Sequence, residues 1–218
     1  MCRKKMSVGT AFHPFTPTGS YFMQHTLRQW SATLALITLT CGTGAMAATV
    51  TPTSYTFDEP TACGSWCYHD PSLTKLTDGV IGNAGWAANA GNEWVGWVYQ
   101  PQVNIDFSFA SVSSIGAVSI GSTQDYLGDV ALPTFSVSAF ESGNWVLKGT
   151  LVNPPSSAND NSPYSTAPHS FYTLSNLGIT SNKVRVSVSA NGPWSFVDEV
   201  RFTNSVSAVP EPETRSIQ

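Results

Sequence analysis

The sequence predicts an all-β protein, an antiparallel β-sandwich of jelly-roll type with eight or nine strands. Apolar and polar residues alternate with a period of two in several segments, which is typical of a strand with one buried face. Clusters of Gly, Pro, Asn and Ser separate these segments, and no long stretch has the apolar stripe of an amphipathic helix. This many short strands in a single domain favours a sandwich.

Composition supports this fold class. A chain of 218 residues allows one large all-β domain or two small domains. The hydrophobic content of 41% is enough for a core, and the low charged content of 11% disfavours a coiled coil or a helical bundle. The net charge of −4 disfavours a protein that binds nucleic acid by neutralising phosphates, so we expect no nucleic-acid partner.

The charges are distributed unevenly along the chain. Four of the 10 basic residues lie before residue 48, whereas all 14 acidic residues follow it. The chain from residue 48 onward therefore has a formal charge of −8. A targeting segment at the N-terminus would explain this asymmetry.

Residues 23–47 have the pattern of a secretory signal peptide. A weakly basic segment precedes the apolar run 32–39, and Ala45-Met46-Ala47 is a cleavage site that would leave Ala48 as the first mature residue. The apolar run is too short to span a membrane, which takes about 20 residues. A buried helix of the domain is the alternative.

These patterns divide the chain into four parts. We interpret the first part as an extension upstream of the true start, the second as the signal peptide, the third as the folded domain and the last as a tail. The boundaries are 1–22, 23–47, 48–204 and 205–218.

Each expected strand follows from its own pattern of residues. In the segment 103–109, Val, Ile and Phe alternate with Asn, Asp and Ser, and the segments 135–139 and 184–188 alternate in the same way. Shorter apolar or aromatic runs bounded by turn residues supply the others. In chain order, we expect strands at 54–57, 93–98, 103–109, 115–122, 135–139, 144–152, 170–174, 184–188 and 196–203.

The mature chain has two cysteines in its N-terminal part, Cys63 and Cys67. In an exported protein they are expected to form a disulfide, which closes a very small loop and stabilises the fold by about 2 kcal/mol. The alternative is a zinc site that adds His69, although an obvious fourth ligand is missing. A redox-active pair is disfavoured because the spacing is not that of a Cys-x-x-Cys motif.

Several motifs follow one another in an order typical of one family. They are Lys75-Leu76-Thr77-Asp78-Gly79, Glu93-Trp94-Val95-Gly96-Trp97, Val103-Asn104-Ile105-Asp106-Phe107, Pro133-Thr134-Phe135-Ser136-Val137-Ser138, Lys183-Val184-Arg185-Val186 and Glu199-Val200. This set resembles the galactose-binding-like jelly roll, of discoidin or coagulation-factor type C kind, over roughly residues 54–204. Two positions depart from the family pattern. Ser108-Phe109 replaces a Leu-Gly pair, and Asn182-Lys183 replaces an Arg-Tyr pair.

The tail has a second resemblance. Val209-Pro210-Glu211-Pro212 is similar to the start of a PEP-CTERM sorting signal, which marks exported proteins of Gram-negative bacteria that make extracellular polysaccharide. That signal continues into an apolar helix, whereas the six residues after Pro212 are mostly polar. We therefore expect a secreted or cell-surface protein, attached to the membrane only if the reading frame past Gln218 encodes such a helix.

The family resemblance implies a structural calcium ion. Its ligands would be Asp78, Glu199 and backbone carbonyls of the loop after the first strand, with Asp70 as a third carboxylate. A hard cation takes six to eight oxygen ligands, which a glycine-containing loop can help to supply. The alternative is that Asp78 caps a turn and Glu199 pairs with Lys75 or Arg185.

Carbohydrate binding is the expected activity. The apolar C–H faces of a sugar pack on aromatic rings, while polar side chains bond its hydroxyl groups. Trp66, Tyr68, Trp86 and Tyr126 lie in loops rich in Gly, Pro or Asp, and Asp125 adds a polar group beside Tyr126. Packing within the loops is the alternative role for each of these rings.

The sequence offers no recognisable catalytic motif. It contains no nucleophile elbow, zinc-protease motif or phosphate-binding loop. Adjacent carboxylates such as Asp198 and Glu199 would point to opposite faces of a strand, so they make no acid–base couple by themselves. The leading prediction is a non-catalytic, monomeric module that binds extracellular polysaccharide. The alternatives are a structural matrix or surface protein, and a secreted hydrolase.

Overall fold

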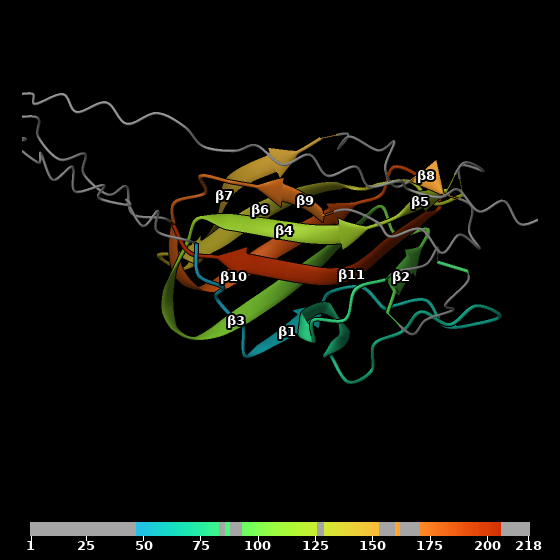
Figure 1. Ribbon diagram of the computed structural model, residues 1–218, viewed down its shortest axis with the longest axis horizontal. Coiled ribbons are helices and arrows are strands. Elements are labelled where there is room, and N and C mark those ends of the chain that lie inside the picture. The colour runs from blue at the N-terminus through green and yellow to red at the C-terminus, as the bar shows by residue number, and fades with distance from the viewer. Residues whose placement is uncertain are drawn as a thin grey trace, which may run out of the picture. The chain divides into compact units, whose positions relative to one another are not determined.

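Two antiparallel β-sheets packed face to face form the described part of the protein (Figure 1). The computed structural model describes residues 47–82, 86–87, 93–125, 129–152, 160–161 and 171–205. All but the last residue of the predicted signal peptide, and the whole Val-Pro-Glu-Pro motif, lie outside these ranges. In the described ranges, no helix is both long and apolar enough to cross a membrane.

The strand order defines the two layers. One sheet has five strands in the order β1-β3-β10-β6-β7, and the other has four in the order β2-β11-β4-β9. A short parallel pair, β5-β8, and one 3₁₀ helix, η1, complete the elements seen in the described ranges. The bounds are β1 Ser54–Phe57, η1 Lys75–Thr77, β2 Val95–Val98, β3 Gln102–Ile115, β4 Ala117–Ser122, β5 Gln124–Asp125, β6 Thr134–Glu141, β7 Asn144–Leu151, β8 Asp160–Asn161, β9 Phe171–Leu174, β10 Ile179–Ser189 and β11 Trp194–Thr203.

The predicted all-β sandwich is confirmed. The nine expected strands correspond to the nine strands of the two larger sheets, while the two-residue strands β5 and β8 were not predicted. The period-two pattern succeeded because it reports burial directly. In β3, Val103, Ile105 and Phe107 are buried between the sheets, whereas Asn104 and Asp106 alternate with them on the outer face.

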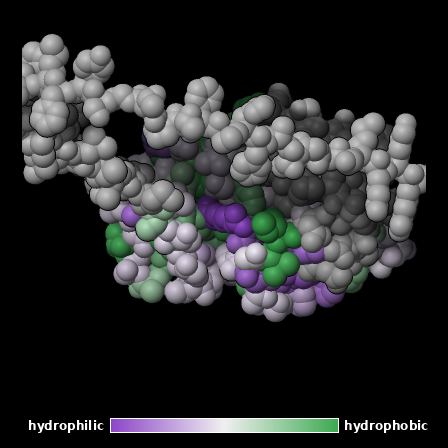
Figure 2. Space-filling view, viewed as in Figure 1, coloured by the Kyte–Doolittle hydropathy of each residue, from purple (hydrophilic) through white to green (hydrophobic). Residues whose placement is uncertain are grey.

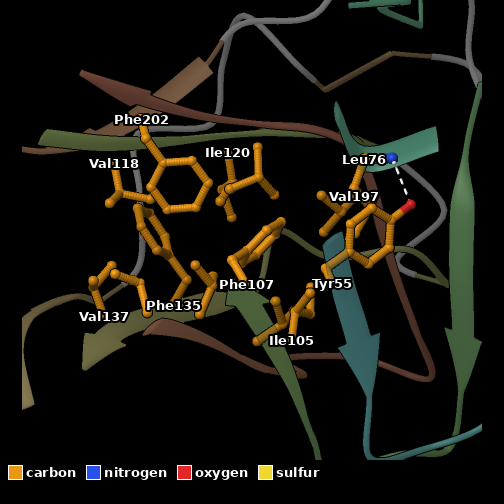
Figure 3. Close-up of a cluster of buried hydrophobic side chains, with 14 of the residues drawn as sticks. Tyr55, Leu76, Ile105, Phe107, Val118, Ile120, Phe135, Val137, Val197 and Phe202 are labelled. Carbon is orange, nitrogen blue, oxygen red and sulfur yellow. Dashed lines mark hydrogen bonds between the residues drawn. The ribbon is translucent and has the colours of Figure 1, made fainter. Parts of the chain in front are cut away.

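The main core lies between the two sheets (Figure 3). Phe107 of β3 packs edge-to-face against Phe202 of β11, with ring centroids 4.9 Å apart, so the two layers meet through large aromatic side chains. Tyr55 brings a hydroxyl group into this apolar interior. That hydroxyl accepts a hydrogen bond of 3.0 Å from the Leu76 amide and donates one to the Asp70 carboxylate, so the loop that contains η1 is held against the core.

The hairpin of β6 and β7 shows why the register of the five-stranded sheet is fixed. Glu141 pairs with Asn144, which leaves Ser142 and Gly143 as a two-residue turn. Both have positive φ, 49° and 85°, as a type I′ turn requires. This turn matches the twist of the flanking strands and sets which side chains face outward.

A second, smaller core lies beside the main one. Tyr68, Trp94, Val130 and Phe196 are its buried members, and Trp86 and Trp194 pack against it. Strand β2 approaches this cluster closely at Gly96, where an added Cβ would lie 2.5 Å from the Phe196 ring and 3.0 Å from the Tyr68 Cβ. Only glycine fits between these rings.

We predict that Gly96→Ala lowers the free energy of unfolding by about 1–3 kcal/mol, because its methyl group forces Phe196 out of place. Gly64→Ala is the matched control, since no atom lies within 4 Å of the Cβ that it adds. Urea unfolding followed by tryptophan fluorescence measures both variants. Equal stability of the two variants would contradict the close packing at Gly96.

Candidate functional site

The residues 62–68 form a small hairpin that extends the edge of the four-stranded sheet. The Ala62 amide donates to the Gly96 carbonyl at 2.8 Å, and the Gly96 amide donates to the Tyr68 carbonyl at 3.0 Å. Within the hairpin, the Tyr68 amide donates to the Ala62 carbonyl at 2.8 Å. The hairpin is thus fixed to β2 at both of its ends, and Trp66 lies near its tip.

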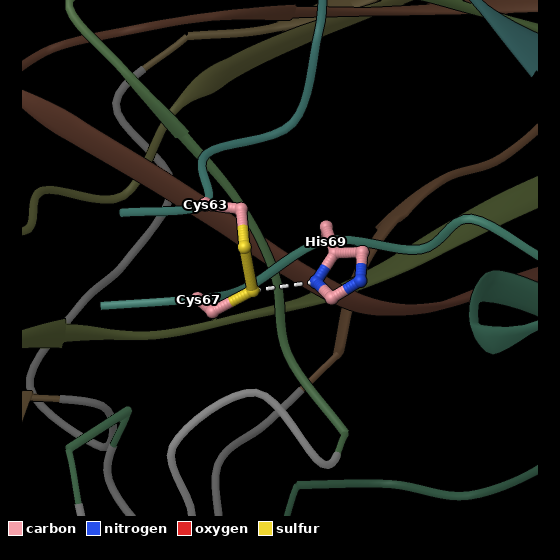
Figure 4. Close-up of a disulfide and its surroundings, with 3 residues drawn as sticks. All are labelled: Cys63, Cys67 and His69. Carbon is pink, nitrogen blue, oxygen red and sulfur yellow. Dashed lines mark hydrogen bonds between the residues drawn. A yellow bond between two sulfur atoms is a disulfide. The ribbon is translucent and has the colours of Figure 1, made fainter. Parts of the chain in front are cut away.

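The hairpin contains the predicted disulfide (Figure 4). Cys63 and Cys67 are joined across it, with their Cα atoms 3.9 Å apart, and the Nδ1 atom of His69 lies 2.6 Å from the Cys67 sulfur. The alternative of a zinc site does not hold in this structure. Both sulfurs are used in the disulfide bond, so neither is available as a thiolate ligand.

A hollow of about 260 Å³ lies between this hairpin and the beginning of strand β11. Trp66 forms one wall and is 45% exposed, and Trp194 contributes a second ring. We call this feature the Trp66 hollow. Its lining residues are Ala62, Cys63, Gly64, Ser65, Trp66, Val98 and Trp194.

The rings around the Trp66 hollow hold one another in place. Trp66 contacts Trp86 edge-to-face at 5.9 Å between centroids, and Trp86 stacks on Phe196 at 5.8 Å. Trp194 stacks on Phe196 at 5.4 Å with their planes 4° apart, and Tyr68 meets Phe196 edge-to-face at 4.7 Å. Since the buried Phe196 contacts three of the other rings, the exposed rings rest on a rigid base.

The predicted ligand-binding residues divide into two groups. Trp66 is exposed as expected, and Trp86 is half-buried beside it. Tyr68 was expected to contact ligand, but it is completely buried under Trp86 and Trp194, so it supports the site from below. Asp125 is also buried and accepts a hydrogen bond of 3.2 Å from the Trp86 Nε1, so it orients that ring. Tyr126 lies outside the described residues.

Two residues of this region were missed by the sequence reasoning. Trp194 was not among the predicted ligand-binding residues, yet it lines the Trp66 hollow. Tyr99 directly follows β2 and is 82% exposed, with its amide donating to the Pro193 carbonyl at 2.8 Å. A large aromatic residue just after a strand, two positions before Pro101, is the sequence signal that could have identified Tyr99.

The carboxylate of Asp70, an expected calcium ligand, makes its hydrogen bonds within the protein. Its carboxylate accepts hydrogen bonds from the Tyr55 hydroxyl, the Ser72 hydroxyl and the amides of Thr74 and Lys75. Burial and the bond to Asp70 raise the pKa of Tyr55 well above its ordinary value, so Tyr55 stays a hydrogen-bond donor. These contacts organise the turn that leads into η1.

The other two expected ligands, Asp78 and Glu199, meet at one loop. The Gly79 amide donates to Glu199 at 3.2 Å, and Asp78 caps the turn by accepting from the Val80 amide at 2.8 Å. The turn-capping role expected for Asp78 as the alternative is thus observed. Arg185, however, is bonded to Asp106 and not to Glu199.

A third carboxylate, Asp198, reaches the same loop. It accepts a hydrogen bond of 2.5 Å from the Gly82 amide. The expectation that adjacent Asp198 and Glu199 serve opposite faces was wrong, because the pairing of β11 with β4 shifts register between Val197 and Val200. Such a bulge reorients side chains locally, so both carboxylates contact the loop 79–82.

The surface over this loop mixes apolar and polar groups. Leu73, Val80 and Ile81 are exposed apolar side chains next to the acidic residues. Figure 2 shows hydrophobic surface beside hydrophilic surface in the part of the view where Figure 1 places η1.

Comparisons with known proteins give a likeness of fold. No protein-family model and no curated protein matches the sequence. Among solved structures, the C-terminal domain of a chitobiase from Bacteroides fragilis is similar at a TM-score of 0.49 and 10% identity, over 73% of this chain and 99% of that chain.

Two further structures in that comparison are carbohydrate-binding modules. The family 32 module of NanJ from C. perfringens, in complex with galactose, has a TM-score of 0.46 and 11% identity, over 73% of this chain and 100% of that chain. The family 32 module of AlyQ, in complex with 4,5-unsaturated mannuronic acid, has a TM-score of 0.47 and 13% identity, over 72% of this chain and 99% of that chain. The likeness concerns the fold alone.

The environment of Glu199 predicts how stability depends on pH. Burial raises the pKa of its carboxyl to about 7, with repulsion from Asp78 and Asp198 adding to this and the Gly79 amide and Arg201 opposing it. The folded protein therefore holds this proton more tightly than the unfolded chain, whose glutamate pKa is about 4.5. The stability that results is fully present below about pH 4.5 and is lost as the pH rises through about 7.

Glu199→Gln should remove this loss, since glutamine stays neutral. Urea unfolding in EDTA between pH 4.5 and 8 measures the difference between the variant and the parent protein. Glu141→Gln is the control, because Glu141 lies at the surface in an ion pair with Lys148. Parallel pH profiles for the parent protein and Glu199→Gln would show that Glu199 titrates as an ordinary glutamate.

Proposed function

We propose that this protein is an exported, non-catalytic module of the cell envelope or extracellular matrix that binds polysaccharide at the Trp66 hollow. The observation that carries the proposal is the exposed Trp66 ring beside Trp194, over a packed aromatic base. Partly exposed rings that are already fixed lose little conformational entropy when a ligand packs on them.

The lining of the hollow favours a neutral sugar. Its side chains are mostly apolar, and none of the seven described lining residues is charged. An apolar sugar face can stack on Trp66, while the backbone groups of the hairpin and Ser65 offer polar contacts at the rim. Because the lining provides no pair of carboxylates, it supports binding and not acid–base hydrolysis.

The alternative of a purely structural surface protein is less well supported by the same geometry. A protein-contact surface would be a flat apolar patch, whereas Trp66 and Trp194 face a hollow of about 260 Å³. The hairpin that carries Trp66 is also cross-linked by a disulfide and bonded to β2. Such rigid support is expected for a site that must keep its shape.

We predict that Trp66→Ala weakens binding of a neutral polysaccharide about tenfold or more. Covering about 60 Å² of ring surface contributes roughly 1.5 kcal/mol at 25 cal/mol/Å², which corresponds to a factor of about ten. A glycan array of neutral polysaccharides identifies the ligand, and titration calorimetry compares the variants. Val112→Ala, which removes an exposed apolar side chain of β3 away from the hollow, is the control.

Two results would reject this site. Either no neutral glycan is retained by the parent protein, or Trp66→Ala and Val112→Ala bind the identified glycan with equal affinity. The second result would place any sugar site elsewhere on the protein.

We further propose that Asp78 and Glu199 hold a structural calcium ion. Burial is the main cause of the raised pKa of Glu199, and the negative charges of Asp78 and Asp198 add to it. A divalent cation would relieve this repulsion. Gly79, at a φ of 81°, gives the loop a backbone conformation that other residues rarely adopt.

Calcium should raise the melting temperature measured in EDTA-treated protein, and Asp78→Asn should reduce that rise. Asp129→Asn is the control for loss of one exposed carboxylate. Differential scanning calorimetry with and without calcium gives the readout, and magnesium tests selectivity. An unchanged melting temperature on adding calcium at low ionic strength would exclude the ion.

A further inference from the structure

A second hollow, of about 300 Å³, lies at the five-stranded sheet. Its lining differs in chemistry from that of the Trp66 hollow. It includes the rings of Phe140 and Trp145, the charged groups of Asp106 and Lys183, and hydroxyl groups such as that of Ser108. We call it the Trp145 hollow.

The strand register explains how residues far apart in sequence line one hollow. Ser54 of β1 pairs with Ser108 of β3, and Ser108 pairs with Lys183 of β10. On the other side of β10, Phe140 of β6 pairs with Trp145 of β7. These side chains therefore form a row across the sheet, with hydroxyl groups at one end, Lys183 in the middle and aromatic rings at the other.

The next row fixes the position of the Trp145 ring. The Arg185 guanidinium lies 4.4 Å from the centre of that ring and donates two hydrogen bonds to Asp106, at 2.6 and 2.8 Å. The bond to Asp106 raises the pKa of Arg185, so the pair stays ionised. Phe140 meets Trp145 edge-to-face at 5.2 Å, which supports the ring from a second side.

Lys183 is the one charge in this hollow that lacks an opposite partner among the described residues. Its ammonium lies 5.7 Å from the centre of the Phe140 ring, and its side chain is exposed. The acids nearby are already bonded, since Asp106 is held by Arg185 and Asp58 accepts from the Asn104 amide and side chain at 2.7 and 2.6 Å. An incoming anion would therefore meet an available ammonium.

We propose that the Trp145 hollow binds a carboxylated sugar, a uronate residue of an acidic polysaccharide. Lys183 pairs with the sugar carboxylate, the rings of Trp145 and Phe140 face the apolar side of the sugar, and Asp106 and Ser108 bond its hydroxyl groups. The net charge of the chain is negative, so this recognition depends on the local ammonium and not on the overall field. The site is independent of the Trp66 hollow.

The test uses polygalacturonate and its fully methyl-esterified form, which have the same sugar backbone and differ in carboxylate charge. Affinity electrophoresis in EDTA excludes bridging by calcium. The full protein should be retarded by polygalacturonate and much less by the ester, and Lys183→Gln should reduce the retardation at least fivefold. Added salt should weaken it, since an ion pair carries the recognition.

Lys148→Gln is the matched control, because it removes the same charge from the same sheet at a lysine already paired with Glu141. It should leave retardation unchanged, as should Trp66→Ala, which alters only the first hollow. The proposal is overturned if polygalacturonate fails to retard the parent protein, if the ester binds equally well, or if Lys183→Gln and Lys148→Gln behave alike. Loss of binding in Trp66→Ala alone would place the acidic sugar in the Trp66 hollow instead.

Discussion

The burial of strand β11 is the constraint on which the rest of the structure depends. Every residue from Ser195 to Val200 is buried, although a strand in a sandwich ordinarily buries only one face. Some side chains of β11, including those of Val197 and Phe202, belong to the core between the sheets. Phe196 points instead into the small aromatic core below the Trp66 hollow.

The bulge in β11 adds a third role to the same strand. By shifting the register between Val197 and Val200, it turns Asp198 and Glu199 toward the loop that follows η1. Two buried carboxylates would be costly in an apolar interior, and the amides of Gly79 and Gly82 offset part of that cost. The main core, the aromatic base and the acidic loop are therefore linked through one strand.

The two hollows differ in how they are stabilised and in what they can recognise. The Trp66 hollow is formed in part by a hairpin that backbone hydrogen bonds and a disulfide hold in place. The walls of this hollow are mostly apolar. The Trp145 hollow lies on the sheet itself, where strand pairing sets the spacing of its charged and aromatic groups. Stacking suits a neutral sugar face, whereas we propose that the ammonium of Lys183 pairs with a carboxylate.

The sequence by itself determined the features that depend on near neighbours. The nine main strands could be placed because alternation and short apolar runs between turn residues both report burial along the chain. The disulfide could be expected because Cys63 and Cys67 are four positions apart in a chain predicted to be exported. The exposure of Trp66 followed from its place in a short polar loop. Tertiary structure decided the rest. Tyr68 is buried because Phe196, from a distant strand, packs against it, and Asp198 joins Glu199 because of a bulge that no local pattern reveals. Lys183 and Trp145 share a hollow only through the order of strands in the sheet, which is set by long-range pairing.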